Sequence, residues 1–151
     1  MAALVVSGCS GGDGGGSSHC KDDGSGDNFV LTTGTYDLHD IDVVTDGCQL
    51  TDGISFASVS VSGSTVSMGV LDLARTGNSL EGSGSTTNDQ SPFDCVLRTS
   101  VTGSGVVTGN DAFRITEEEI VITVESGTEC TDAVEVLIPC STKLSFCAEK
   151  P

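Results

Sequence analysis

Basic residues are scarce in this chain, and long apolar runs are missing. Its 151 residues include 6 Lys and Arg against 22 Asp and Glu, which gives a formal net charge of -16. A field of that sign repels nucleic acid and anionic lipid head groups, so we predict no nucleic-acid partner. No stretch approaches the run of about 18 or more apolar residues that a transmembrane helix requires. The length leaves room for one domain of ordinary size.

The N-terminal segment combines a short apolar run with a cysteine. Leu4-Val5-Val6 is followed by the small residues Ser7 and Gly8 and then by Cys9. This segment resembles the lipobox of bacterial lipoproteins, in which a diacylglycerol is attached to the cysteine and the signal is cut just before it. The resemblance implies cleavage after Gly8 and lipidation at Cys9. Secretory leaders have a positively charged start and an apolar core of about 7 to 15 residues. Residues 1–8 are short for such a leader and contain no Lys or Arg, so we interpret them as a truncated signal.

The residues after Cys9 have the composition of a linker. Residues 10–26 are almost entirely Gly, Ser and Asp, and such a stretch buries too little apolar surface to fold. We therefore expect a lipidated tether over residues 9–27 and a single folded domain over residues 28–151. Two or more acyl chains anchor a protein stably, so the resemblance implies an exported protein held at the outer membrane, facing the periplasm or the cell surface.

Cysteines are numerous for a chain of this size, with seven in all. Apart from Cys9, an even number remains, as a disulfide framework requires: Cys20, Cys48, Cys95, Cys130, Cys140 and Cys147. None of these forms a C-x-x-C pair, and the two histidines do not lie at zinc-finger spacing, which disfavours a structural zinc site. We predict disulfides formed in an oxidising compartment. Among the many possible connectivities we favour Cys130 with Cys147 and Cys48 with Cys95.

The folded part has the pattern of many short strands. From Phe29 onward, Val, Ile, Thr and Ser dominate, and Gly, Asn and Asp interrupt them at short intervals. Ile120, Ile122 and Val124 alternate with more polar residues, which places them on one face, and we interpret the three glutamates at 117–119 as a turn. The predicted strands are 35–44, 54–62, 65–74, 79–86, 93–102, 106–108, 112–116, 120–125, 133–138 and 143–147.

The apolar positions of the first predicted strand change parity. Tyr36 and Leu38 are even-numbered, whereas Ile41 and Val43 are odd-numbered. A β-bulge inserts one extra residue and reverses which face the following side chains occupy. We therefore predict a bulge near His39-Asp40, which would bring all four apolar residues to one face.

The strand pattern predicts an all-β domain. About ten short strands joined in sequence favour an antiparallel meander that closes on itself as a barrel, with a β-sandwich as the alternative. Gly34-Thr35-Tyr36 resembles the G-x-W that opens lipocalin-type barrels, with Tyr in place of Trp, and this resemblance implies a lipocalin- or calycin-like up-and-down barrel. The chain has no Trp, which counts against a ligand pocket of the usual aromatic kind.

Four residues of the first strand are candidate metal ligands. Asp37 and His39 share one face, and Asp40 and Asp42 share the other. Carboxylates and imidazole supply the oxygen and nitrogen lone pairs that divalent metals bind. The alternative is a solvated strand face beside a bulge, and we predict no resident cofactor.

The sequence indicates a binding or structural role more than catalysis. General acid–base catalysis needs a positioned histidine or carboxylate in a cleft, and no spacing in the chain identifies one. We expect a non-catalytic envelope domain that binds an unknown protein or small molecule, with the membrane as a partner through the N-terminal lipid. The alternatives are an envelope hydrolase with a site on loops and a calcium-dependent adhesion module. A binding domain should present an apolar pocket, and an enzyme should present converging titratable groups.

Overall fold

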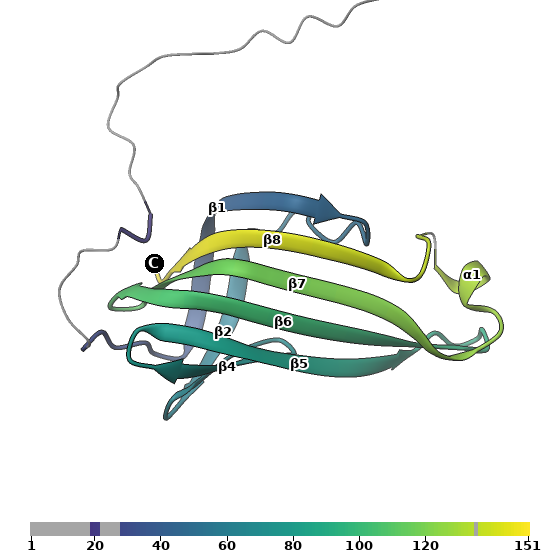
Figure 1. The fold of residues 1–151 in the computed structure, drawn as a ribbon, viewed down its shortest axis with the longest axis horizontal. Coiled ribbons are helices and arrows are strands. Elements are labelled where there is room, and N and C mark those ends of the chain that lie inside the picture. Colours follow the sequence, from purple (N-terminus) through teal and green to yellow (C-terminus); the bar gives the residue numbers. More distant parts are fainter. Residues whose placement is uncertain (1–18, 22–27, 135) are drawn as a thin grey trace, which may run out of the picture.

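The computed structural model describes residues 19–21, 28–134 and 136–151. These residues form eight β-strands and one short helix (Figure 1). The elements are β1 (Gly34–Asp46), β2 (Phe56–Ser62), β3 (Thr65–Met68), β4 (Leu71–Thr76), β5 (Ser79–Asp89), β6 (Cys95–Gly109), β7 (Ala112–Gly127), α1 (Cys130–Ala133) and β8 (Cys140–Glu149).

The eight strands form one sheet that closes into a ring. Each strand pairs antiparallel with the next along the chain, and β8 pairs with β1. The all-β antiparallel meander predicted from the sequence is therefore confirmed. The two-sheet sandwich considered as the alternative is not formed, because the first and last strands hydrogen-bond to each other.

Alternation along the strands sorts side chains between the inside and the outside of the ring. On β4, Leu71 and Leu73 are buried, whereas Asp72 and Ala74 between and after them are exposed. This two-residue period is a consequence of the pleat. The inward side chains from all sides of the ring meet in one main core, which includes Tyr36, Val59, Leu80, Val101, Val107, Phe113 and Phe146.

Several predicted strand boundaries are wrong. The predicted strand 65–74 is divided into β3 and β4 by a turn at Gly69, whose φ of 58° suits glycine. The predicted strands 93–102 and 106–108 are one strand, β6. Part of the predicted strand 133–138 is helix α1, and Pro139 follows, which has no N–H to donate to a sheet.

The glutamates at 117–119 do not form a turn. They lie within β7, which continues from Ala112 to Gly127. The pairing of β7 with β8 shifts register between Ile115 and Glu118, and the pairing with β6 shifts between Ser104 and Gly105. The irregularity that the acidic triplet indicated is thus a bulge inside a long strand.

The bulge predicted in the first strand is confirmed. The register of β1 against β8 shifts between His39 and Asp42, and Asp40 has a positive φ of 51°. Tyr36 is fully buried, and Leu38 and Ile41 pack against the core. Val43 pairs with Leu144, a buried core residue, so it lies on the same inner face as predicted, although it is 40% exposed.

One end of the ring is closed by the segment that precedes β1. Leu31 is buried in the core, and the neighbouring backbone bonds to the hairpin between β6 and β7. The Asp111 carboxylate accepts hydrogen bonds from the Thr32 backbone N–H (2.7 Å) and from the Tyr36 hydroxyl (2.9 Å). Lys150 Nζ donates to Thr32 Oγ1 at 2.8 Å. This network ties the entering chain to three strand ends.

All six candidate cysteines are paired, but the pairing that we favoured is wrong. The disulfides are Cys20–Cys147, Cys48–Cys140 and Cys95–Cys130. The strand order explains the difference. The end of β1 pairs with the start of β8, which brings Cys48 to Cys140, whereas Cys147 lies toward the other end of β8, away from α1 and Cys130.

Candidate functional site

The ring contains an apolar pocket of about 420 Å³. It lies between the short strands β2 and β3 on one side and β7, β8 and β1 on the other, and it is lined by Leu38, Ile54, Phe56, Met68, Leu144 and Phe146 among others. This volume falls within the range of about 300 to 1,000 Å³ that is usual for small-molecule sites. Phe56, at the start of β2, is 62% exposed.

The loop between β1 and β2 forms one wall, and Asp46 holds that loop. The Asp46 carboxylate accepts hydrogen bonds from the backbone N–H groups of Leu50 (2.8 Å) and Thr51 (3.3 Å), from the Thr51 hydroxyl, and from Thr142 Oγ1 (2.9 Å). These bonds, led by that of the Thr51 hydroxyl, lower the pKa of Asp46 to about 2. Leu50 and Thr51 both line the pocket, so an ionised side chain fixes this part of its wall.

Glu118 is the titratable side chain of the pocket. After the bulge in β7, Glu118 shares a face with Ile120, which packs against the core and also lines the pocket. Burial raises the pKa of the Glu118 carboxyl, and no hydrogen bond or neighbouring charge among the described residues offsets that effect. The pocket therefore places one poorly solvated carboxyl group in a mostly apolar wall.

The pocket has the chemistry of a binding site for an amphipathic molecule. Its apolar walls favour a hydrocarbon body through the hydrophobic effect. The Glu118 carboxyl offers a single hydrogen-bonding and electrostatic contact at a defined point of the wall. No other titratable side chain lines this pocket among the described residues, so the converging acid and base of a hydrolytic site are not formed there.

The four metal-ligand candidates of β1 do not come together. Asp40 and Asp42 are exposed, and neither belongs to a group of potential ligands in the described part of the chain; nor does Asp37. His39 does belong to such a group, with His19 and Glu149. Lipidation at Cys9 stays a prediction, because that residue lies outside the described residues.

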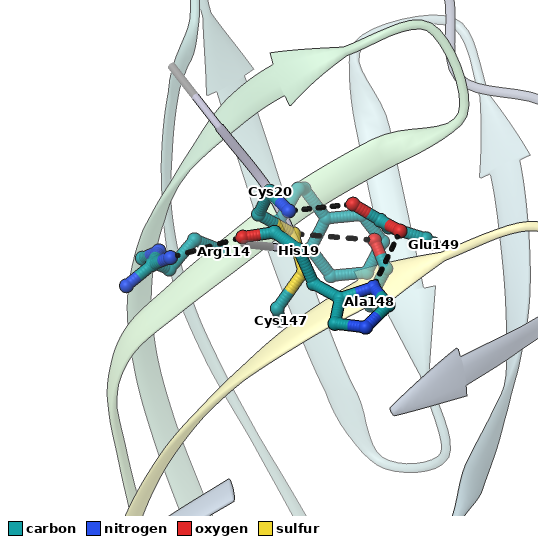
Figure 2. The surroundings of a disulfide bond; sticks show 7 residues. His19, Cys20, Arg114, Cys147, Ala148 and Glu149 are labelled. Carbon is teal, nitrogen blue, oxygen red and sulfur yellow. Dashed lines mark hydrogen bonds and ion pairs between the residues drawn. A yellow bond between two sulfur atoms is a disulfide. The ribbon is translucent and has the colours of Figure 1, made fainter. Parts of the chain in front are cut away.

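The group around His39 lies on the outer face of β8 and β1. The imidazole rings of His19 and His39 stack with centroids 3.7 Å apart and planes 7° apart. His19 Nδ1 lies 3.0 Å from Glu149 Oε2, and the Cys20 N–H donates to the other Glu149 oxygen (Figure 2). The hydrogen bond from Cys20, followed by that from His19, lowers the pKa of Glu149 although burial opposes the shift.

Sequence reasoning missed Glu118 and this histidine pair for different reasons. Glu118 has the same parity as Ile120 and Ile122, which were placed on the apolar face, so alternation alone could have shown that it points inward. His19 and Glu149 are 130 residues apart. Their proximity depends on the Cys20–Cys147 disulfide, whose pairing the sequence leaves open.

No protein family, curated protein or solved structure matches this chain in the comparisons. Within the described residues, no helix is long and apolar enough to cross a membrane.

Proposed function

We propose that this protein is a lipid-anchored, exported envelope protein whose lipocalin-like barrel binds a small amphipathic molecule, in particular an aliphatic amine. The observation that carries the proposal is the apolar pocket with Glu118 in its wall. The three disulfides support an oxidising compartment such as the periplasm. The lipobox-like segment that ends at Cys9 supports the anchor, and Gly34-Thr35-Tyr36 supports the likeness to lipocalins.

The head group of the ligand follows from Glu118. A carboxyl that is partly removed from water and has no partner among the described residues gains most from a ligand that brings a charged hydrogen-bond donor. An ammonium group provides both the charge and the donor. A net charge of -16 also draws cations toward the protein through the long-range field. An anionic head group would face repulsion from both sources.

Two alternatives receive less support than binding. A hydrolase needs several titratable groups in one cleft, whereas Glu118 is alone among the described residues of this pocket. Calcium prefers six to eight oxygen ligands, and each of the two groups of potential metal ligands in the described residues contains one carboxylate. Neither observation favours the hydrolase or the calcium-dependent adhesion module.

A displacement series tests the pocket and its head-group preference together. An apolar fluorescent probe, N-phenyl-1-naphthylamine, is bound to the protein and displaced by decylamine, decanol or decanoate, which share one chain length. We expect the amine to bind roughly 10- to 100-fold more tightly than the alcohol, as one charge-assisted hydrogen bond allows, and decanoate to bind most weakly. Equal affinity of all three, or tightest binding of decanoate, would contradict the role given to Glu118.

Matched variants locate the binding. Glu118→Gln should abolish the preference for the amine, whereas Glu117→Gln, the same change at an exposed neighbour, should preserve it. Ala57→Phe adds a ring to a pocket-lining position and should block probe binding, whereas Ala74→Phe on the exposed face of β4 should not. Probe binding that survives Ala57→Phe would place the ligand elsewhere.

The anchor is tested separately by intact mass. The chain is expressed in a bacterial host with a full-length lipoprotein leader, and the protein is purified from membranes. We expect a mass that corresponds to cleavage before Cys9 plus acyl chains, and the Cys9→Ala variant should lack both. An unmodified mass that retains residues 1–8 would overturn the lipid anchor while leaving the pocket assignment standing.

A further inference from the structure

The two histidines of the chain meet on the outside of the ring. The chain contains only two, and they come from different segments: His39 lies in β1, and His19 precedes the first strand. The nitrogen and oxygen atoms that His19, His39 and Glu149 offer all lie within 4.8 Å of one another. On the inner side of the same strands, Leu38 lines the pocket and Ala148 packs in the core, so this group is separate from the pocket.

The backbone around the group holds its members in place. Register pairs His39 with Cys147 and Asp37 with Glu149, so β1 and β8 fix two of the three side chains relative to each other. The third member, His19, is attached through the Cys20–Cys147 disulfide, and Arg114 Nη2 donates to its backbone oxygen at 3.3 Å (Figure 2). The sheet and the disulfide thus bring together two residues near the beginning of the described chain and one near its end.

From this geometry we propose that His19, His39 and Glu149 form a binding site for a divalent transition metal of the Zn²⁺ type. Two imidazole nitrogens and one carboxylate oxygen are a ligand set that Zn²⁺ accepts, with a water molecule in the fourth position. The site would be distinct from the amphipathic pocket and does not depend on the function proposed for it.

The distances in the group are close to those that such an ion requires. Tetrahedral Zn²⁺ with bonds of about 2.0 to 2.2 Å places its ligand atoms roughly 3.3 to 3.6 Å from one another. His19 Nδ1 and Glu149 Oε2 are already 3.0 Å apart, and no pair in the group exceeds 4.8 Å. Because imidazole lone pairs lie in the ring plane, the stacked rings would bind one ion only after at least one of them turned about its side-chain bonds.

The surroundings admit and attract a cation. The side chains of His19 and Glu149 are 29% and 32% exposed, which leaves a path for a hydrated ion. Asp37 lies opposite Glu149 in the neighbouring strand and adds a second negative charge nearby. The ion would join the segment before β1 to both β1 and β8, next to the disulfide that already links that segment to β8.

Zinc titration followed by NMR of the imidazole groups tests the site. The full chain is used without reductant so that the disulfides remain intact, and Cys9→Ala is introduced throughout so that its thiol does not compete for metal. With two histidines in the chain, the spectrum contains two imidazole groups. We expect both to change together and to saturate at one Zn²⁺ per chain. A change in one imidazole alone, or no saturation at one equivalent, would overturn the proposal.

Variants assign the third ligand. Glu149→Gln keeps an oxygen that accepts the Cys20 N–H, and it should lower Zn²⁺ affinity by more than the 10- to 100-fold typical of losing an outer partner of a metal ligand. Asp40→Asn, an exposed position on β1, should leave affinity unchanged. If Glu149→Gln does not fold, His19→Ala, which lies outside all strands, should show the same loss. Wild-type affinity in the folded variant would exclude the site.

Discussion

Alkaline titration of Tyr36 tests the closed end of the ring. The side chain is fully buried, its ring packs against Phe113 with centroids 5.5 Å apart, and its hydroxyl lies 2.9 Å from the Asp111 carboxylate. Burial, followed by the hydrogen bond to Asp111, raises the pKa of Tyr36 from 10.0 to about 12. Ionisation would place a buried phenolate next to a carboxylate, which the native structure resists.

The change in stability has a defined sign and pH window. A group with a raised folded-state pKa contributes stability that is fully present below its unfolded pKa and is lost as pH rises through its folded pKa. For Tyr36 the loss begins near pH 10 and is complete above about pH 12. Because one pKa unit corresponds to 1.36 kcal/mol, the loss amounts to roughly 3 kcal/mol, a large part of the free energy of unfolding of an ordinary domain.

Absorbance of the tyrosinate measures this titration directly. The chain has one Tyr and no Trp, so the near-ultraviolet change on ionisation comes from Tyr36 alone. We expect a midpoint near pH 12 in the folded protein and near pH 10 in denaturant. Asp111→Asn should lower the folded midpoint, whereas Asp52→Asn in an exposed loop should not. A midpoint near pH 10 while circular dichroism still shows the native sheet would refute the buried hydrogen-bonded placement of Tyr36.

Two further predictions concern packing and charge. A Cβ at Gly84 would lie 1.5 Å from a backbone oxygen of Val70, whereas one at Gly103 would meet the end of a leucine side chain at 2.8 Å. We therefore expect urea denaturation to show that Gly84→Ala lowers the free energy of unfolding by about 3 kcal/mol and Gly103→Ala by about 1 kcal/mol. Equal losses in the two variants would argue against the close approach of the strands at Gly84. Burial raises the pKa of Glu118 above 4.5, so its charge lowers stability as pH rises through the folded pKa. Glu118→Gln should therefore raise the melting temperature at neutral pH with no gain below about pH 4.5, and the same gain in exposed Glu117→Gln would contradict the assignment.

The all-β antiparallel meander could be predicted from the sequence because alternation is a local signal. Leu71 and Leu73 on β4 show the two-residue period directly, and the parity change around His39 and Asp40 correctly predicted a bulge. The predicted strand boundaries are wrong where a bulge and a turn give the same sequence pattern. The acidic triplet at 117–119 is the clearest case, since its irregularity bends a continuous strand.

Contacts between distant residues could not be read from the sequence. The pairing of Cys48 with Cys140 follows from the meeting of β1 and β8, which is known only once the sheet is seen to close. The pocket depends on the same closure, because Phe146 and Met68 lie on strands that are far apart in the chain. A residue pattern predicts which side chains point inward, but it does not predict the distance between the opposite walls of the pocket.

The binding of an amphipathic amine in the pocket is the central claim, and methionine methyl NMR tests it most directly. The chain has two methionines, Met68 in the pocket wall and Met1 at the start of the sequence. Decylamine is added to the full chain labelled at the methionine methyl groups. The account predicts a saturable change in the Met68 signal and loss of the response in Ala57→Phe. An unchanged Met68 signal at saturating decylamine would contradict it.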